Sequence, residues 1–340
     1  MEHLVKDQQL TFKDFSTDQD VRWCPGCGDY AILSAMQKAL PQIGKEKKDI
    51  VFISGIGCSS RFPYYVETYG FHSIHGRAPA IATGVKLANP DLSVWQITGD
   101  GDALAIGGNH FVHVLRRNVD INMILFNNEI YGLTKGQFSP TSKTGIQTKS
   151  SPQGTVDKAF NPGKLAIGAG ATFFARVVDV DPKKMVEVFV EAEKHRGTSL
   201  VEILQNCVIF NDKVFSAITD KDVKLDNQLW LEHGKPMIFG KENNKGIRLN
   251  GLKLEVVTIG ENGITENDIL VHDAYCEDET LHNMLVNMTL PEMPVAFGVI
   301  RSVKASTFND KLWEQISHEK TKAKFSSIDE IVNSGVTWEI

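Results

Sequence analysis

Short apolar runs alternate with amphipathic stretches along the first two thirds of the chain. Runs rich in β-branched residues that are apolar throughout are typical of strands buried on both faces. The predicted strands are 51–54, 92–98, 121–126, 173–178 and 199–204. Helices are predicted at 78–88, 107–117 and 182–195. Strands and helices in alternation predict an α/β fold with a mostly parallel sheet and helices on both faces.

The pattern changes after Phe215, where Gly/Asn turns break up the apolar runs. It predicts a hairpin near 252–259 and two amphipathic stretches, so we divide the chain into a domain at 1–215 and an irregular C-terminal extension at 216–340. The extension is expected to pack on the core and on a partner subunit. Segment 139–155 is rich in Ser, Thr, Gly and Pro, which predicts a mobile loop over the edge where the strands end.

Charge and composition narrow the function classes. The chain has 340 residues, with 36 basic and 42 acidic side chains and a net charge of −6, which argues against a general nucleic-acid binder. No apolar run approaches the ~18 residues of a membrane helix. The polar segment 1–20 lacks the apolar stretch of a signal peptide, so we expect a cytoplasmic protein. Five cysteines are an odd number for a disulfide framework.

The cysteines are the first candidate chemistry. Cys24-Pro-Gly-Cys27 resembles a redox dithiol, but no buried strand precedes it as such a motif requires. A pair at this spacing more often supplies half of a four-thiolate site, and Cys58 and Cys207 follow two predicted strands. Spacing alone does not separate zinc from an iron–sulfur cluster. The alternative, four cysteines buried separately as small apolar residues, explains Cys24 and Cys27 poorly. Cys276, in an acidic stretch of the extension, is left out of the set.

A second motif also lies at strand ends. Gly99-Asp-Gly-Asp102 follows one predicted strand and Asn127-Asn128 follows the next, so Asp100 and Asn128 are expected side by side at one edge of the sheet. Glycines let backbone N–H groups approach a phosphate, and Mg²⁺ prefers such oxygen ligands. Ile130 could add only its backbone carbonyl. The pattern resembles a thiamine-diphosphate signature, and it is neither a dinucleotide-binding Gly-x-Gly-x-x-Gly nor a Walker motif.

Together, the two motifs resemble the β subunit of the 2-oxoacid:ferredoxin oxidoreductases. The matching stretches are Trp23-Cys-Pro-Gly-Cys-Gly28, Gly55-Ile-Gly-Cys-Ser-Ser60, His75-Gly-Arg-Ala78, Gly99-Asp-Gly-Asp102, Asn127-Asn-Glu-Ile-Tyr-Gly-Leu-Thr134 and Cys207. Arg61-Phe62 and Tyr131-Gly-Leu-Thr-Lys-Gly-Gln137 are most similar to the 2-oxoglutarate branch. The resemblance covers about residues 20–210 and implies a pyrophosphate-type thiamine-diphosphate-binding domain.

The resemblance also implies a set of site residues. Cys24, Cys27, Cys58 and Cys207 would hold one four-iron–four-sulfur cluster, and Asp100, Asn128 and the Ile130 carbonyl would bind Mg²⁺. The residues that would line thiamine diphosphate are Ile56, Gly57, Cys58, Ser59, His75, Gly101, Asp102, Gly132 and Leu133.

The implied reaction is the oxidative decarboxylation of a 2-oxoacid to its acyl-CoA and carbon dioxide, with electrons passing singly through the cluster to ferredoxin. Thiamine catalysis also needs a carboxylate against the aminopyrimidine ring, normally a Glu of a second α/β domain, which this chain lacks. We therefore expect the active site at an interface with an α subunit, or a fused α/γ subunit, of the same enzyme.

Three further residues are catalytic candidates, each with an ordinary alternative. Arg61 could pair with a substrate carboxylate or be a surface or interface arginine. His75 could bind phosphate or relay protons, or be a structural hydrogen-bonding residue. Lys135 could attract an anionic substrate or be a solvated lysine.

The whole-protein alternatives are a pyruvate-specific member of the same family, a non-redox thiamine-diphosphate lyase or transferase, and a zinc-stabilised assembly subunit. A visible spectrum and metal analysis separate the last two from the main hypothesis, because a cluster is brown and zinc is colourless.

Overall fold

An eight-stranded sheet in the order β2-β1-β3-β4-β6-β5-β11-β7 forms the centre of the computed structural model, which describes residues 10–338. Neighbouring strands run parallel except β5 and β11, which are antiparallel. The predicted mostly parallel sheet is therefore confirmed. The strands of this sheet are β1 (Ile50–Ser54), β2 (Tyr69–His72), β3 (Ser93–Gly99), β4 (Asn122–Asn127), β5 (Phe173–Val178), β6 (Ser199–Leu204), β7 (Gln228–Leu231) and β11 (Val295–Ser302).

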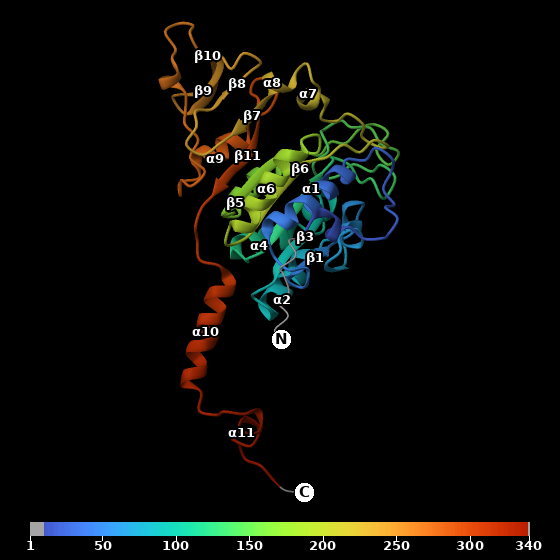
Figure 1. Ribbon diagram of the computed structural model, residues 1–340, viewed down its shortest axis with the longest axis vertical. Helices are drawn as coiled ribbons and strands as arrows, with labels where there is room; N and C mark the ends of the chain where they lie inside the picture. The colour runs from blue at the N-terminus through green and yellow to red at the C-terminus, as the bar shows by residue number, and fades with distance from the viewer. Residues whose placement is uncertain (1–9, 339–340) are drawn as a thin grey trace, which may run out of the picture.

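Helices cover both faces of the sheet, as Figure 1 shows. Successive side chains of a strand point to opposite faces, so β1 contributes Val51 and Ile53 to the core under α2 and α4, and Ile50 and Phe52 to the core under α1 and α6. The longer helices are α1 (Asp29–Ile43), α2 (Ala78–Ala88), α4 (Gly108–Arg117), α6 (Pro182–Lys194) and α10 (Phe308–Lys322). The shorter ones are α3 (Asp100–Leu104), α5 (Pro162–Gly168), α7 (Ser216–Thr219), α8 (Lys224–Asn227), α9 (Thr280–Val286) and α11 (Ile328–Val332). The 3₁₀ turns are η1 (Phe12–Phe15), η2 (Lys47–Asp49), η3 (Ser59–Tyr64) and η4 (Glu266–Asp268).

Local sequence explains where several helices begin and end. The Asp181 side chain accepts a hydrogen bond from the Lys184 amide, and Pro182 follows, so α6 has both a capping acceptor and a first residue that needs no donor. Asn118 ends α4 in the left-handed region, a conformation that asparagine tolerates better than most residues. These local signals are why the predicted helix bounds lie within one residue of the observed ones.

The C-terminal extension completes the main sheet rather than packing as a separate layer. Its strands β11 and β7 continue the sheet beyond β5. The predicted hairpin is present as β9 (Lys245–Asn250) and β10 (Lys253–Thr258), which pair with β8 (Ile238–Phe239) in a three-stranded sheet. The extension therefore stabilises the edge of the core domain.

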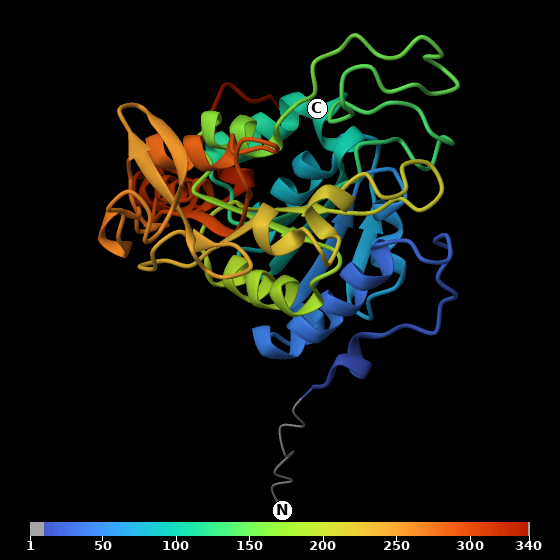
Figure 2. The same ribbon diagram turned by 90° about the horizontal axis from the view of Figure 1, so that it is seen from above.

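The carboxyl ends of the parallel strands β1, β3, β4 and β6 lie at one edge of the sheet. The loops that follow β1, β4 and β6 gather there with the segment that precedes α1, on one side of the molecule in Figure 2. The predicted loop over this edge is present, and its first residues, 139–142, are largely buried. The edge is consequently lined by residues from several distant parts of the chain.

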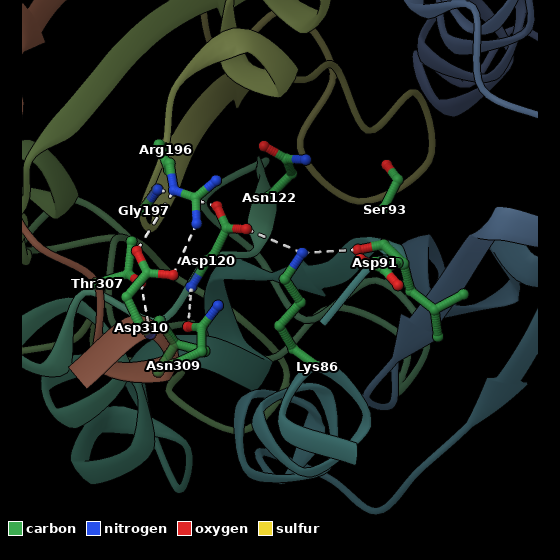
Figure 3. Close-up of polar contacts among 12 residues, drawn as sticks. Lys86, Asp91, Ser93, Asp120, Asn122, Arg196, Gly197, Thr307, Asn309 and Asp310 are labelled. Carbon is green, nitrogen blue, oxygen red and sulfur yellow. Dashed lines mark hydrogen bonds and ion pairs between the residues drawn. The ribbon is translucent and has the colours of Figure 1, made fainter. Parts of the chain in front are cut away.

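The opposite edge anchors a C-terminal arm, which we define as residues 307–338. Figure 3 shows its root: Arg196 pairs with Asp310 at 2.7 Å, and the Asp120 amide donates to Asn309. Lys86 pairs with Asp120 at 2.9 Å. Because Asp120 precedes β4 and Arg196 precedes β6, the arm begins at the amino ends of the strands, away from the edge described above, and α10 and α11 extend from the body (Figure 1).

Among residues 10–338, no helix combines the length and the apolar character needed to cross a membrane. Most of the predicted polar segment 1–20 lies within these residues, and its first nine residues lie outside them.

A buried ion pair in the sheet gives the first prediction. Arg176 on β5 and Glu202 on β6 face each other, 2.7 Å apart between Nε and Oε2, and are 5% and 1% exposed. The variant Arg176→Met leaves the Glu202 charge buried without its partner, so we expect the free energy of unfolding to fall by about 3–5 kcal/mol in urea denaturation. Arg176→Met with Glu202→Leu should recover most of that loss.

The matched control is Arg196→Ala, which breaks the exposed pair with Asp310. It should lower the free energy of unfolding by no more than about 1 kcal/mol. Equal losses from the two arginine variants would contradict the prediction.

Candidate functional site

A small hollow of about 40 Å³ lies at the carboxyl edge of the sheet, beneath the loops that follow β1, β3 and β4. It brings together Asp100 from the end of β3 and Asn128 and Ile130 from the end of β4, as their positions at strand ends predict. All the predicted cofactor-lining residues except His75 also line it: Ile56, Gly57, Cys58, Ser59, Gly101, Asp102, Gly132 and Leu133. The diphosphate-type motif and one of the four candidate cysteines, Cys58, thus line the same hollow.

Asp100 is a carboxylate buried without a cationic partner among the described residues. It is 3% exposed, and burial raises its pKa to about 6 although two hydroxyls donate to it. Ser139 Oγ and Thr141 Oγ1 lie 2.5 and 2.6 Å from the same oxygen, Oδ2. A bound cation would compensate the charge of such a group, so the residue fits the predicted magnesium ligand.

Asn128 lies in a tight turn at the end of β4. Its Oδ1 accepts a hydrogen bond from the Ile130 amide at 3.1 Å, and its Nδ2 donates to Gln205 Oε1 at 2.9 Å. These two bonds fix the amide plane and leave Oδ1 with a second lone pair for a cation. Gln205 also donates to Cys27 Sγ at 3.3 Å, so it joins the diphosphate-type motif to the cysteines.

Gly101 lies directly under the ring of Tyr131. A Cβ at Gly101 would lie 2.1 Å from Tyr131 Cε1, a distance that no side chain can accept. The tyrosine hydroxyl in turn donates to the Gly101 carbonyl at 2.9 Å. Glycine is therefore required at this position for the loops after β3 and β4 to approach each other.

Asp102 accepts hydrogen bonds from the loops around it. Its Oδ1 accepts from the Ile56 amide at 3.1 Å and the Gly76 amide at 2.7 Å, and its Oδ2 accepts from Thr98 at 2.7 Å. His75 Nδ1 lies 2.8 Å from Oδ1. With both oxygens engaged by the protein, the side chain fixes the loops after β1 and β2 relative to the hollow.

The three segments that carry the four candidate cysteines meet at this edge of the sheet. A Cβ at Gly132 would lie 3.5 Å from Cys58 Sγ and 3.6 Å from Cys207 Sγ, so both sulfurs face this glycine. Trp23 donates to the Cys58 carbonyl at 2.7 Å, which ties the segment carrying Cys24 and Cys27 to the loop after β1. The Gly28 amide donates to the Asn206 carbonyl next to Cys207. Cys276 lies elsewhere, in a loop that Arg301 holds within the extension.

Two of the thiols, those of Cys27 and Cys58, are poor acids in this environment. Burial raises the pKa of Cys58 to about 12, and burial and the nearby Asp29 carboxylate raise the pKa of Cys27. Cysteines ligate as thiolates, so binding of a metal group would have to displace their protons. Residues 10–338 contain no set of three or more His, Cys, Asp or Glu side chains arranged around a single metal ion.

The three catalytic candidates lie around the hollow without lining it. Arg61 is in η3, two residues after Ser59, where its Nε donates to Tyr65 Oη at 3.0 Å. His75 is held against Asp102 and is about one third exposed. Lys135 is exposed and adopts a left-handed backbone conformation with φ of 69° in the turn after Gly132.

Sequence reasoning missed Ser139, Thr141 and Glu129. The two hydroxyl residues belong to the segment read as a surface loop, and nothing in the local pattern signals that it turns inward. Glu129 follows Asn128 with φ of 55°, and burial raises its pKa to about 7. A non-glycine residue in the left-handed region at a strand end is a structural sign of a constrained site, but it is invisible in the sequence.

Comparisons with known proteins agree with this geometry. Residues 55–203 match the family model described as thiamine pyrophosphate enzyme, C-terminal TPP binding domain. This range contains the hollow's glycine and aspartate motifs.

Full-length relatives extend the match beyond that domain. The chain is 48% identical over 337 residues to 2-oxoglutarate oxidoreductase subunit KorB of Mycobacterium tuberculosis, covering 98% of this chain and 90% of the relative. It is 41% identical to 2-oxoglutarate synthase subunit KorB of Methanocaldococcus jannaschii, over 66% of this chain and 84% of the relative. It is 48% identical to the 2-oxoacid:ferredoxin oxidoreductase subunit beta of Saccharolobus solfataricus, over 60% of this chain and 68% of the relative.

A solved structure shares the fold. One chain of the 2-oxoglutarate:ferredoxin oxidoreductase of Magnetococcus marinus, determined with 2-oxoglutarate, coenzyme A and succinyl-CoA bound, superposes with a TM-score of 0.77 at 30% identity and covers 97% of both chains. With the near full-length match to the mycobacterial subunit, this agreement confirms the resemblance seen in the motifs. The chain belongs to the β-subunit family of the 2-oxoacid:ferredoxin oxidoreductases.

Proposed function

We propose that this β subunit binds thiamine diphosphate, Mg²⁺ and one iron–sulfur cluster, and that with an α subunit it converts 2-oxoglutarate and coenzyme A to succinyl-CoA and carbon dioxide, passing electrons to ferredoxin. The observation that carries the proposal is Gly132. It lines the hollow with Asp100 and Asn128, and it also faces the sulfurs of Cys58 and Cys207.

Each donor set fits the group assigned to it. Asp100 is a buried carboxylate without a cationic partner, and Asn128 supplies a fixed amide oxygen beside it. Four thiols on three segments, tied together through Trp23, Gly28 and Gln205, suit a cluster, because several irons spread their thiolates further apart than one ion does.

The arrangement couples the two groups through short loops. When bound, thiamine diphosphate supplies the nucleophilic carbon that releases carbon dioxide from a 2-oxoacid, and a cluster accepts the remaining electrons one at a time. Cys58 and Ser59 are adjacent, so the loop after β1 would contact both groups. Asp102 fixes this loop by accepting a hydrogen bond from the Ile56 amide.

The substrate assignment rests on relatives. The mycobacterial and methanogen relatives are named for 2-oxoglutarate, and the Magnetococcus enzyme was solved with it. Arg61, two residues beyond the hollow-lining stretch that ends at Ser59, is held by Tyr65 through Nε, so its two terminal nitrogens can receive the distal carboxylate of this substrate.

The cluster assignment predicts a selective loss of colour. The enzyme purified without oxygen should show the broad visible absorption of an iron–sulfur cluster, and Cys207→Ser should remove most of it together with the iron. Cys276→Ser is the matched control and should keep both. Full iron content in Cys207→Ser, or a colourless parent containing about one zinc per chain, would contradict the assignment.

The substrate assignment predicts a split in KM. Because Arg61→Ala removes a charge-assisted contact to the distal carboxylate, we expect the KM for 2-oxoglutarate to rise about tenfold or more and the KM for pyruvate to change little. Arg22→Ala, which removes an exposed arginine paired with Asp20, should change neither value. Equal changes for the two substrates in Arg61→Ala would show that the residue does not recognise that carboxylate.

The partner assignment predicts inactivity of the isolated chain. Residues 10–338 form one main sheet and one small three-stranded sheet, so a second α/β domain with the carboxylate for the aminopyrimidine ring has to come from the α subunit. The single chain, loaded with its cofactors, should show no turnover with any 2-oxoacid, and co-expression with the α subunit should restore it. Full activity of the pure single chain would contradict this.

A further inference from the structure

Two hydroxyl side chains reach the Asp100 carboxylate from the loop that follows β4. Ser139 and Thr141 are 2% and 3% exposed, and both donate to Asp100 Oδ2, at 2.5 and 2.6 Å. They come from a part of the chain about forty residues beyond Asp100. We call Ser139 and Thr141 the hydroxyl clasp.

Ser142, in the same loop, fixes the hydroxyl clasp by hydrogen bonds. Ser142 Oγ accepts from the Ser139 amide at 2.8 Å and donates to the Glu129 carbonyl at 2.5 Å. The loop that carries the clasp is therefore bonded to the turn after β4, which also carries Asn128. Asp100 and Asn128, which carry the two predicted side-chain ligands of magnesium, are thus joined through this loop.

Thr141 is also fixed from the interior of the sheet. Its Oγ1 lies 3.0 Å from Asn127 Oδ1, and Asn127 Nδ2 donates to Glu202 Oε1 at 2.8 Å. Glu202 is paired in turn with Arg176. Because one hydroxyl carries one proton, Thr141 shares it between Asp100 and Asn127, and the carboxylate is the stronger acceptor. Thr141 therefore connects the Asp100 carboxylate to the buried network of Asn127, Glu202 and Arg176.

Both bonds of the clasp reach the same carboxylate oxygen. Oδ2 is engaged twice, and Oδ1 has no hydroxyl donor among the described residues. Two donors on one oxygen fix the rotation of the carboxylate about its last torsion, so Oδ1 keeps a single direction. A ligand held in this way binds a cation without first losing conformational freedom.

We propose that Ser139 and Thr141 are positioning residues that orient Asp100 so that Oδ1 faces the cation of a magnesium-bound diphosphate. The inference rests on the proposed function and deepens it, because it assigns the magnesium affinity of the site to a loop outside the glycine and asparagine motifs. The residues touch the ligand Asp100 and neither the cation nor the diphosphate.

The test measures magnesium dependence in the complex purified with its α subunit. The complex is stripped with a chelator, and the retention of thiamine diphosphate in equilibrium dialysis is followed as Mg²⁺ is added. Ser139→Ala and Thr141→Val each remove one charge-assisted hydrogen bond to Asp100, so each should raise the half-saturating Mg²⁺ concentration about tenfold. At saturating Mg²⁺, the affinity for thiamine diphosphate should stay near that of the parent.

Two variants serve as controls. Thr141→Ser keeps the hydroxyl and should restore a half-saturating Mg²⁺ concentration close to the parent value. Thr144→Val makes the same chemical change three residues further on, where the hydroxyl is exposed and donates to the Asp157 carbonyl, and it should leave the magnesium dependence unchanged. Thermal unfolding of the stripped complexes shows whether each variant is folded. If Thr141→Val does not fold, the half-saturating Mg²⁺ concentration of Ser139→Ala alone tests the proposal.

The outcomes distinguish a failure of the proposed function from a failure of the hydroxyl clasp. A parent complex that retains thiamine diphosphate equally with and without Mg²⁺ would overturn the proposed function. A magnesium-dependent parent whose Ser139→Ala and Thr141→Val variants match Thr144→Val would overturn the clasp alone. A lower melting temperature in those variants with an unchanged half-saturating Mg²⁺ concentration would also overturn it, because the hydroxyls would then serve folding only.

Discussion

The buried carboxylate of Asp100 is the constraint on which the rest of this site depends. A carboxylate removed from water at the end of β3 has to be compensated, and neighbouring hydroxyls do so only in part, because its pKa remains raised. Asp100 lines the hollow together with Asn128. In the proposed function, this uncompensated charge is what favours a divalent cation at the site.

The sheet explains how the residues proposed to hold two cofactors can share so small an area. Parallel strands end at one edge, so the loops after β1, β3, β4 and β6 meet there although they are far apart in sequence. Cys58 follows β1, Cys207 follows β6, and Gly132 between them follows β4. The extension adds β11 and β7 at the far side of β5, and its arm starts from the opposite edge. The C-terminal extension and the candidate site therefore lie at different edges of the sheet.

Much of this arrangement could be predicted because its signals are local. Apolar strand runs, helix-capping residues and strand-end glycines depend on neighbours in sequence, and the predicted bounds of α2 and α6 agree with the structure to within a residue. Contacts between distant segments left no such signal. The inward turn of Ser139 and Thr141, and the use of Asp102 to hold the loop at Ile56, depend on tertiary packing. The local pattern of the hydroxyl-rich segment 139–155 therefore predicts only a loop over the edge.

The most direct test of the central claim, that thiol and diphosphate sites lie side by side at one edge, is anomalous diffraction at the iron edge from oxygen-free crystals of the assembled enzyme. The account predicts strong iron peaks enclosed by Cys24, Cys27, Cys58 and Cys207, with density for a cation-bound diphosphate between Asp100 and Asn128 in the same map. Iron bound at other residues, or a diphosphate that does not contact Asp100, would contradict it.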